Sequence, residues 1–214
     1  MVPLSGEAGR CHVLGMVRQQ ILRGEFAPQQ RLHEPFLAEL HHVTRASVRA
    51  ALIDLAGEGL VERTLHRGSR VRVVPVAEAV EIIECRIALE ALCARKAALA
   101  AGTREREELV SLGTEMTRAV GAGDVGRYAE LNQQLHQRVI DLSGHEIARD
   151  MLARLNAQLV RHEYQLALRP GGPKKSLGEQ LAIVDAIAAG DPAAAENAIC
   201  EHLRSVMRDL SGPA

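Results

Sequence analysis

Chain-breaking residues divide this sequence at Pro75, and that division most constrains how it can fold. Before Pro75 the helical periodicity is short, and two β-rich runs, "LVERT" and "SRVRVV", flank "LHRG", which is typical of a β-hairpin. After Pro75, long helical segments are interrupted at "GAGD", "SGH", "RPGGP" and "AGDP". The sequence therefore predicts two domains, residues 1–75 and residues 76–214.

The first domain is predicted to hold three short helices before the hairpin. The first covers "VLGMVRQQILRGEF", and "APQQRLHE" is expected to be a loop. The second begins at Pro35 and turns Leu37 and Leu40 inward. Thr44 suits the N-cap of the third helix, which ends near Glu58. Three short helices and a hairpin make a winged helix-turn-helix.

The second domain is predicted to be all-α. Its expected helices cover residues 77–101, 104–121, 124–143, 146–169, 175–189 and 192–210. Leu and Ala dominate the apolar residues, whereas only two Phe, two Tyr and no Trp are present, which also favours a helical core. The predicted fold class is mainly α, with an N-terminal winged helix-turn-helix, a small β-hairpin wing and a C-terminal helical bundle.

Composition narrows the class of protein. The N-terminus lacks the apolar region of a signal peptide and no run of about 18 apolar residues occurs, so we expect a cytoplasmic protein without a membrane partner. Up to Pro75 there are ten Arg and no Lys against seven acidic residues, whereas the remainder has sixteen Lys and Arg against twenty acidic residues. A basic first domain indicates an anionic partner.

The third helix opens with "TRASVRAAL", in which Arg45 and Arg49 enclose small side chains. The arc predicted to face solvent holds Ala46, Ser47, Arg49, Ala50 and Ile53. Short side chains let a helix approach the bases of the major groove, while arginines reach guanine or phosphate. An ordinary surface helix with scattered arginines is the alternative.

The hairpin tip is the second predicted DNA contact. His66 and Arg67 precede Gly68, and Arg70 and Arg72 follow on the next strand. A tip of this kind can lie along a minor groove, where arginine is favoured. A solvated hairpin is the alternative.

Residues 21–71 resemble the winged-helix domain of the GntR family of bacterial transcription regulators. The family pattern "G-V-S-R-x-x-V-R-x-A-L-x-x-L-x-x-E-G-L-V" matches residues 42–61, with departures at His42, Ala50 and Ile53 that bear on the operator sequence. The resemblance implies DNA contacts from the recognition helix and the wing, through Thr44, Arg45, Ser47, Arg49, His66 and Gly68.

Four polar residues are expected to converge inside the bundle. Asn132 and His136 share one helix face, and Gln180 and His202 each lie in line with apolar residues of their own helices. Bundle interiors commonly hold metals or small ligands. The alternative is that both histidines are hydrogen-bonded core residues.

The helical part resembles the FadR-type branch of the family, whose FCD effector domain often holds a divalent metal through an Asp or Asn and three His. From His136, the branch's offsets of about 44 and 66 residues fall on Gln180 and His202. Asn132, His136 and His202 therefore match the metal pattern, and Gln180 replaces an expected His. Because amides are poor ligands, we expect Zn²⁺ or Ni²⁺ to bind weakly.

Arg86 is predicted to be buried, because Ile82, Leu89 and Cys93 flank it on an apolar line. It either pairs with Glu90, one turn on, or binds the carboxylate of a small organic acid. The branch's ligands are commonly metabolic carboxylates, so the resemblance favours the second reading. The predicted effector site comprises Arg86, Asn132, His136, Gln180 and His202.

Together these features predict a DNA-binding transcription regulator. We expect a homodimeric repressor on pseudo-palindromic, double-stranded operator DNA, with a small carboxylate metabolite as its effector. The alternative is a metal-dependent enzyme with a DNA-binding appendage. The sequence contains no H-E-x-x-H, no phosphate-binding glycine loop and no G-x-S-x-G, so we predict that it is not an enzyme.

Overall fold

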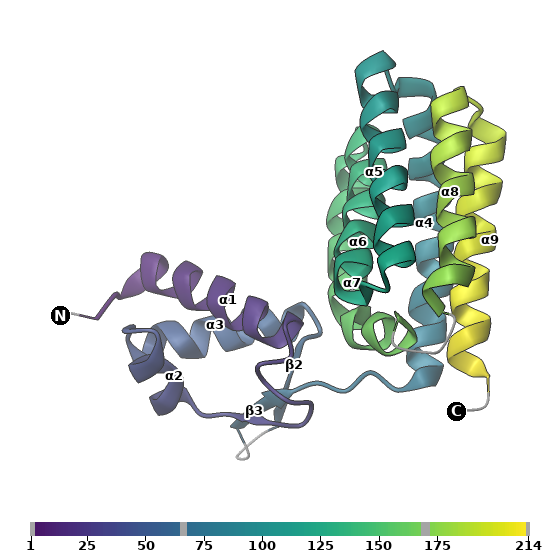
Figure 1. Cartoon of the computed structure of the whole chain (residues 1–214). Coiled ribbons are helices and arrows are strands. Elements are labelled where there is room, and N and C mark those ends of the chain that lie inside the picture. The colour runs from purple at the N-terminus through teal and green to yellow at the C-terminus, as the bar shows by residue number, and fades with distance from the viewer. Residues whose placement is uncertain (1–2, 65–67, 168–171, 213–214) are drawn as a thin grey trace. The chain divides into compact units, whose positions relative to one another are not determined.

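The computed structural model describes residues 3–64, 68–167 and 172–212. The chain divides into two compact units (Figure 1). Residues 1–74 with residues 156–161 form the winged-helix unit, and residues 75–155 with residues 162–214 form the helical unit. The separate roles predicted for residues 1–75 and 76–214 stay predictions.

The winged-helix unit confirms the predicted three helices and hairpin and adds a short strand. Its antiparallel sheet has the order β1-β3-β2. Gln29 N donates to Val71 O at 3.0 Å, and Val71 N donates to Gln30 O at 2.9 Å, so the predicted loop is drawn into the sheet. A two-residue strand leaves no periodic signal in the sequence. The elements are α1 (Gly6–Leu22), β1 (Arg31–Leu32), α2 (Glu34–Leu40), α3 (Arg45–Gly57), β2 (Val61–Thr64) and β3 (Gly68–Val71).

Helix α1 packs against α3. A Cβ atom at Gly9 would lie 2.7 Å from both Leu4 O and Ser47 Oγ, so this position requires glycine. The core of the unit includes the fully buried side chains of Val13, Leu37, Val48, Leu52 and Leu55.

The end of α2 and the turn that follows it correct one prediction. Leu37 is buried, but Leu40 is 44% exposed rather than turned inward, because the buried stripe of this two-turn helix is narrow. The chain then reverses through His42, which has a φ of 52°. Histidine tolerates this left-handed conformation less easily than glycine does.

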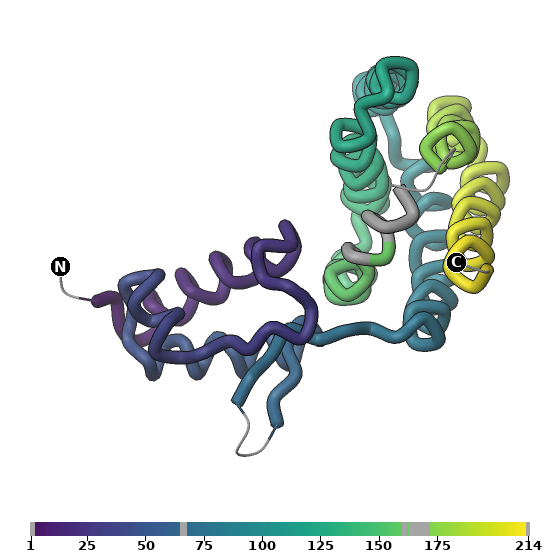
Figure 2. Tube along the Cα trace, turned by 60° about the horizontal axis from the view of Figure 1, so that its bottom comes forward, coloured from purple at the N-terminus to yellow at the C-terminus, as the bar shows by residue number. Residues whose placement is uncertain are grey.

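The helical unit confirms the predicted all-α bundle. Helix α4 packs against α6, α8 and α9, while α5 packs against α6 and α8. Figures 1 and 2 both show α4 (blue) running beside α9 (yellow). No helix in the described part of the chain is long and apolar enough to cross a membrane. The elements are α4 (Val76–Ala100), α5 (Thr103–Ala122), α6 (Val125–Leu142), α7 (Glu146–Ala167), α8 (Gly172–Ala189) and α9 (Pro192–Ser211).

Two of the predicted interruptions, "GAGD" and "AGDP", contain an aspartate that caps the next helix. Asp191 caps α9, because its side chain accepts hydrogen bonds from Ala193 N and Ala194 N, both at 3.0 Å. Asp124 caps α6 by accepting from Arg127 N at 2.9 Å. Side-chain caps of this kind satisfy backbone donors that have no partner within the helix.

Candidate functional site

Helix α3 presents two arginines to solvent from its first two turns. Thr44 is its N-cap and accepts a hydrogen bond from Ser47 N at 3.2 Å. Arg45 and Arg49 are exposed. Arg49 binds Glu34 at the start of α2, with 2.8 Å between Nη2 and Oε2 and 3.1 Å between Nε and Oε1. The Arg49 guanidinium is therefore held in place while it stays accessible.

Ser47 does not belong to the exposed arc that the helical periodicity predicted for it. Its side chain is only 3% exposed. Its hydroxyl lies 3.0 Å from Thr44 Oγ1 and donates to Gly6 O at 3.4 Å. The start of α1 covers this side of α3, which the periodicity of α3 alone could not reveal. The exposed arc retains Ala46, Arg49 and Ile53.

The predicted wing is described only in part. His66 and Arg67 lie outside the described residues. Gly68 is exposed and has a φ of 81°, a conformation that favours glycine. On the following strand, Arg70 Nη2 lies 2.7 Å from Glu62 Oε2 on β2.

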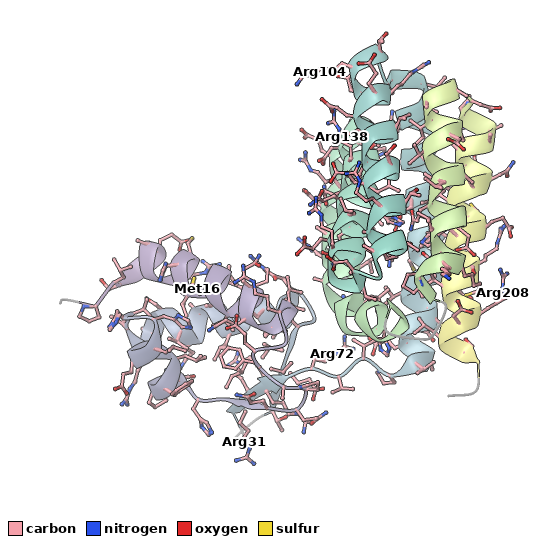
Figure 3. The ribbon with its side chains drawn as sticks, viewed as in Figure 1. Met16, Arg31, Arg72, Arg104, Arg138 and Arg208 are labelled. Carbon is pink, nitrogen blue, oxygen red and sulfur yellow. The ribbon has the colours of Figure 1, made fainter. Side chains whose placement is uncertain are left out.

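Sequence reasoning missed Arg31, because its segment was expected to be a loop. In the sheet, Arg31 on β1 is the register partner of Arg70 on β3. Arg31 is exposed and points away from the core of the winged-helix unit (Figure 3). The strand β1 therefore adds a cation beside those that the hairpin was predicted to carry.

The helical unit brings four predicted effector residues together around one atom. Gln180 Nε2 lies 2.5 Å from Asn132 Oδ1, 3.1 Å from His136 Nε2 and 3.0 Å from His202 Nε2. Three helices contribute these residues: α6 carries Asn132 and His136, α8 carries Gln180, and α9 carries His202. Gln180 has no exposed surface, and both histidines are buried.

Each histidine has a carboxylate on its other ring nitrogen. His136 Nδ1 lies 2.7 Å from Glu90 Oε2, and His202 Nδ1 lies 2.9 Å from Glu179 Oε2. From the sequence, Glu90 was predicted only as a partner of Arg86, and Glu179 was not predicted at all. No spacing rule links Glu179 to a residue on another helix, so only the fold reveals this contact.

Burial and charge act against each other in this cluster. Burial raises the pKa of Glu90, but Arg86 and His136 outweigh that effect and lower its pKa to about 2. Burial lowers the pKa of His202, although Glu179 opposes the shift. Glu90 is therefore ionised at neutral pH, and burial favours a neutral His202.

Arg86 is buried and takes part in this cluster through Glu90. Its Nε donates to Glu90 Oε1 at 2.8 Å, and both side chains are almost fully buried. The structure therefore contains the ion pair that was one of the two alternatives for Arg86. A carboxylate ligand of Arg86 would have to bind in competition with Glu90.

Two family models match the chain. The model for bacterial regulatory proteins of the gntR family matches residues 11–71, and the model for the FCD domain matches residues 81–205. This protein belongs to the GntR family. Its FCD domain is consistent with the FadR-type branch.

Relatives of this GntR-family protein support the assignment. It is 32% identical to an uncharacterized HTH-type transcriptional regulator in an unstable DNA locus of Streptomyces ambofaciens, over 98% of this chain and 88% of the relative. It is 27% identical to the HTH-type transcriptional repressor RspR of Escherichia coli strain K12, over 91% of this chain and 86% of that protein. The protein is therefore a transcription regulator and not an enzyme.

A solved structure shows the same fold. E. coli McbR/YncC is similar with a TM-score of 0.80 at 20% identity, over 97% of this chain and 98% of that chain. At this identity the likeness concerns the fold alone.

The donor set of this GntR-family regulator does not favour a divalent metal. Among the described residues, no group of three or more His, Cys, Asp or Glu side chains could hold one. The predicted ligands Asn132, His136 and His202 instead surround the Gln180 amide nitrogen, which donates hydrogens and offers no lone pair. The weak Zn²⁺ or Ni²⁺ binding expected from the resemblance stays untested.

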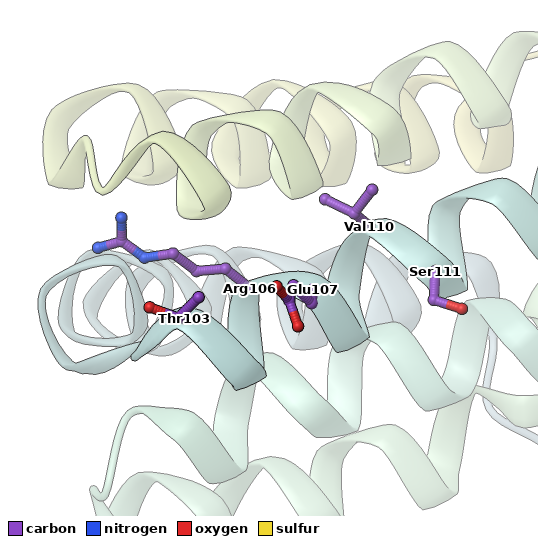
Figure 4. A pocket seen from close by; sticks show the side chains of 5 residues that line it. All are labelled: Thr103, Arg106, Glu107, Val110 and Ser111. Atoms are coloured by element: carbon purple, nitrogen blue, oxygen red, sulfur yellow. The ribbon is translucent and has the colours of Figure 1, made fainter.

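A surface pocket lies elsewhere on the helical unit (Figure 4). Arg106 in its wall donates to Ala101 O at 2.9 Å and to Ala188 O at 3.3 Å, so its guanidinium ties α5 to the end of α8. None of the predicted effector residues lines this pocket. It is lined by Thr103, Arg106, Glu107, Val110 and Ser111 of α5.

Proposed function

We propose that this regulator is a homodimeric, cytoplasmic repressor that releases its operator when a small organic acid binds the FCD domain. Residues 1–75 would bind DNA, and residues 76–214 would bind the effector and form the dimer. One observation carries the DNA-binding half of the proposal. Helix α3 exposes Arg45 and Arg49 beside the small side chain of Ala46, with Thr44 capping its start.

This arrangement suits the major groove of operator DNA. The free N–H groups of a helix N-terminus attract phosphate oxygens. Arginine can donate two hydrogen bonds to guanine, and a small side chain between two arginines lets the helix axis approach the bases. A homodimer would place two such helices on the half-sites of a pseudo-palindrome, because two-fold protein symmetry matches two-fold DNA symmetry.

The buried polar cluster of the helical unit is the proposed effector site. Buried, mutually bonded polar groups are uncommon in a bundle core and restrict which ligand can enter. A carboxylate would bind Arg86 in competition with Glu90 and so disturb the contact between Glu90 and His136. Such a rearrangement would couple ligand binding to the placement of the helices.

Selection of bound fragments from a random DNA pool, repeated with a panel of organic acids, tests this function. We expect one pseudo-palindromic sequence to be enriched and one acid to weaken its binding. Fluorescence anisotropy on the selected duplex then measures both affinities. Enrichment of no sequence by the intact protein contradicts the DNA-binding role, and an operator affinity that no acid changes contradicts the proposed effector class.

A further inference from the structure

The centre of the buried cluster is filled by a hydrogen-bond donor. Gln180 Nε2 lies between 2.5 and 3.1 Å from Asn132 Oδ1, His136 Nε2 and His202 Nε2. A metal would lie much closer to imidazole nitrogens, at about 2.0–2.1 Å for zinc. The three atoms that could bind a cation are thus spaced for hydrogen bonds to an amide nitrogen and not for bonds to a metal.

Both imidazoles present an acceptor to that amide, whose two hydrogens are shared among three acceptor atoms. An ionised carboxylate can only accept, so the contacts with Glu90 and Glu179 place a hydrogen on Nδ1 of each ring. Nε2 of His136 and of His202 is then left with a lone pair. In metal sites a carboxylate commonly holds a ligating histidine in the same way. In this protein the Nε2 lone pairs of both histidines face the amide nitrogen of Gln180.

The reversed orientation of the Gln180 amide is disfavoured. It would place the oxygen of Gln180 beside Asn132 Oδ1 unless that amide reversed as well. It would also require a hydrogen on both Nε2 atoms, and both rings would become cations. Their centroids are 5.3 Å apart in a buried site, where like charges repel strongly.

The amide oxygen of Gln180 indicates that core packing alone does not explain why a glutamine occupies this position. Gln180 Oε1 is buried and has no hydrogen-bond partner among the described residues. An unpaired buried acceptor destabilises a protein, so an apolar side chain would suit the position better if it served only as core. The contribution of Gln180 to this cluster is its nitrogen.

We infer that the FCD domain of this protein works without a metal ion, because the Gln180 amide takes the place of the cation and joins α6, α8 and α9. The inference goes beyond the proposed function and depends on neither the operator nor the effector. To admit a metal, Gln180 would have to leave a position in which it is fully buried.

The test compares metal content and melting temperature in the full-length chain and three variants. Wild type should purify without a stoichiometric metal, and its melting temperature should not respond to Zn²⁺, Ni²⁺, Mn²⁺ or chelator. Gln180→His supplies imidazole in place of the amide and should raise Zn²⁺ or Ni²⁺ affinity by on the order of tenfold or more. Its melting temperature should rise with metal and fall again with chelator.

Two variants separate this effect from a general one. Gln180→Ala removes the donor and should melt below wild type, with part of that loss restored by metal. Gln134→His adds a histidine at an exposed position of the same helix as His136 and should leave the metal response unchanged. A Gln180→His protein that folds by circular dichroism but gains no metal affinity overturns the inference.

Nitrogen-15 spectra of the histidine rings test wild type alone, so the inference does not depend on a variant that folds. Both His136 and His202 should carry hydrogen on Nδ1 and none on Nε2, with or without chelator. A tightly bound metal in wild type, or ring signals that chelator changes, would overturn the inference while leaving the proposed operator binding intact. Failure of operator binding would leave this inference intact.

Discussion

One ion pair from each unit of this regulator shows two opposite uses of charge. In the winged-helix unit, Arg49 and Glu34 form a pair whose side chains are 61% and 29% exposed. In the helical unit, Arg86 and Glu90 form a pair whose side chains are 4% and 3% exposed. Water solvates the first pair if it separates, whereas burial keeps water away from the second. The exposed charges are therefore available to a partner such as DNA, whereas the buried charges depend on partners inside the protein.

Removal of the Glu90 carboxylate should have the largest effect on stability. Glu90→Ala leaves the buried Arg86 cation and the Nδ1 hydrogen of His136 without their shared acceptor. Breaking a buried ion pair in this way costs about 3–5 kcal/mol of unfolding free energy. Urea unfolding of both proteins measures the loss. Glu108→Ala, which breaks exposed pairs with Arg104 and Arg138, is the matched control and should change stability little (Figure 3).

The contribution of Glu90 should also depend on pH in a defined direction. Its pKa is about 2 in the folded protein, below the value of about 4.3 expected when unfolded. A carboxyl group with a lowered pKa adds stability that is complete above its unfolded pKa and is lost as the pH falls through its folded pKa. The stability difference between wild type and Glu90→Gln should therefore be constant near neutral pH and shrink between about pH 4.3 and pH 2. A difference that already shrinks near pH 6 would mean that another group titrates.

Arg49→Ala should separate DNA affinity from stability. If Arg49 contacts a base, operator affinity should fall roughly 5- to 150-fold, while the melting temperature stays close to that of wild type. Arg104→Ala removes another exposed arginine, from α5 of the helical unit, and should change neither quantity. Anisotropy and thermal melting on the three proteins give the comparison. Equal operator affinity in all three would contradict the assigned recognition helix.

Sequence patterns predicted most of this fold, because its helices are long, periodic and clearly capped. They located the exposed Arg45 and Arg49 and the burial of His136, Gln180 and His202, since each depends on spacing within one helix. They failed where a distant segment decides the outcome. Ser47 is buried by α1, Arg31 is brought beside Arg70 by a two-residue strand, and Glu179 meets His202 across two helices.

Thr44→Ala should have a smaller effect on stability than Glu90→Ala, and the effect should be confined to the first turn of α3. The substitution removes the acceptor for Ser47 N and a partner of the Ser47 hydroxyl. Loss of an N-cap typically costs about 1 kcal/mol. Amide hydrogen exchange should therefore become faster in the first turn of α3 and stay unchanged in α8. Thr44→Ser keeps the oxygen and should restore protection, whereas slow exchange in Thr44→Ala would show that the cap adds little.

Glu34→Gln should have the smallest effect on stability and the clearest effect on the charge of the DNA-binding surface. The Arg49 hydrogen bond lowers the pKa of Glu34, so its side chain is ionised at neutral pH. Neutralising Glu34 removes one negative charge beside the recognition helix and releases the Arg49 cation, which is already exposed. Exposed ion pairs contribute little to the free energy of folding, so stability should hardly change. We expect an unchanged melting temperature, tighter binding to non-specific duplex DNA, and a salt dependence steeper by up to about one unit of slope.

Glu108→Gln neutralises the equivalent exposed carboxylate in the helical unit and should leave DNA binding unchanged. If Glu34→Gln instead lowers the melting temperature as Glu90→Ala does, the exposed pair is structural, and the contrast between the two units does not hold.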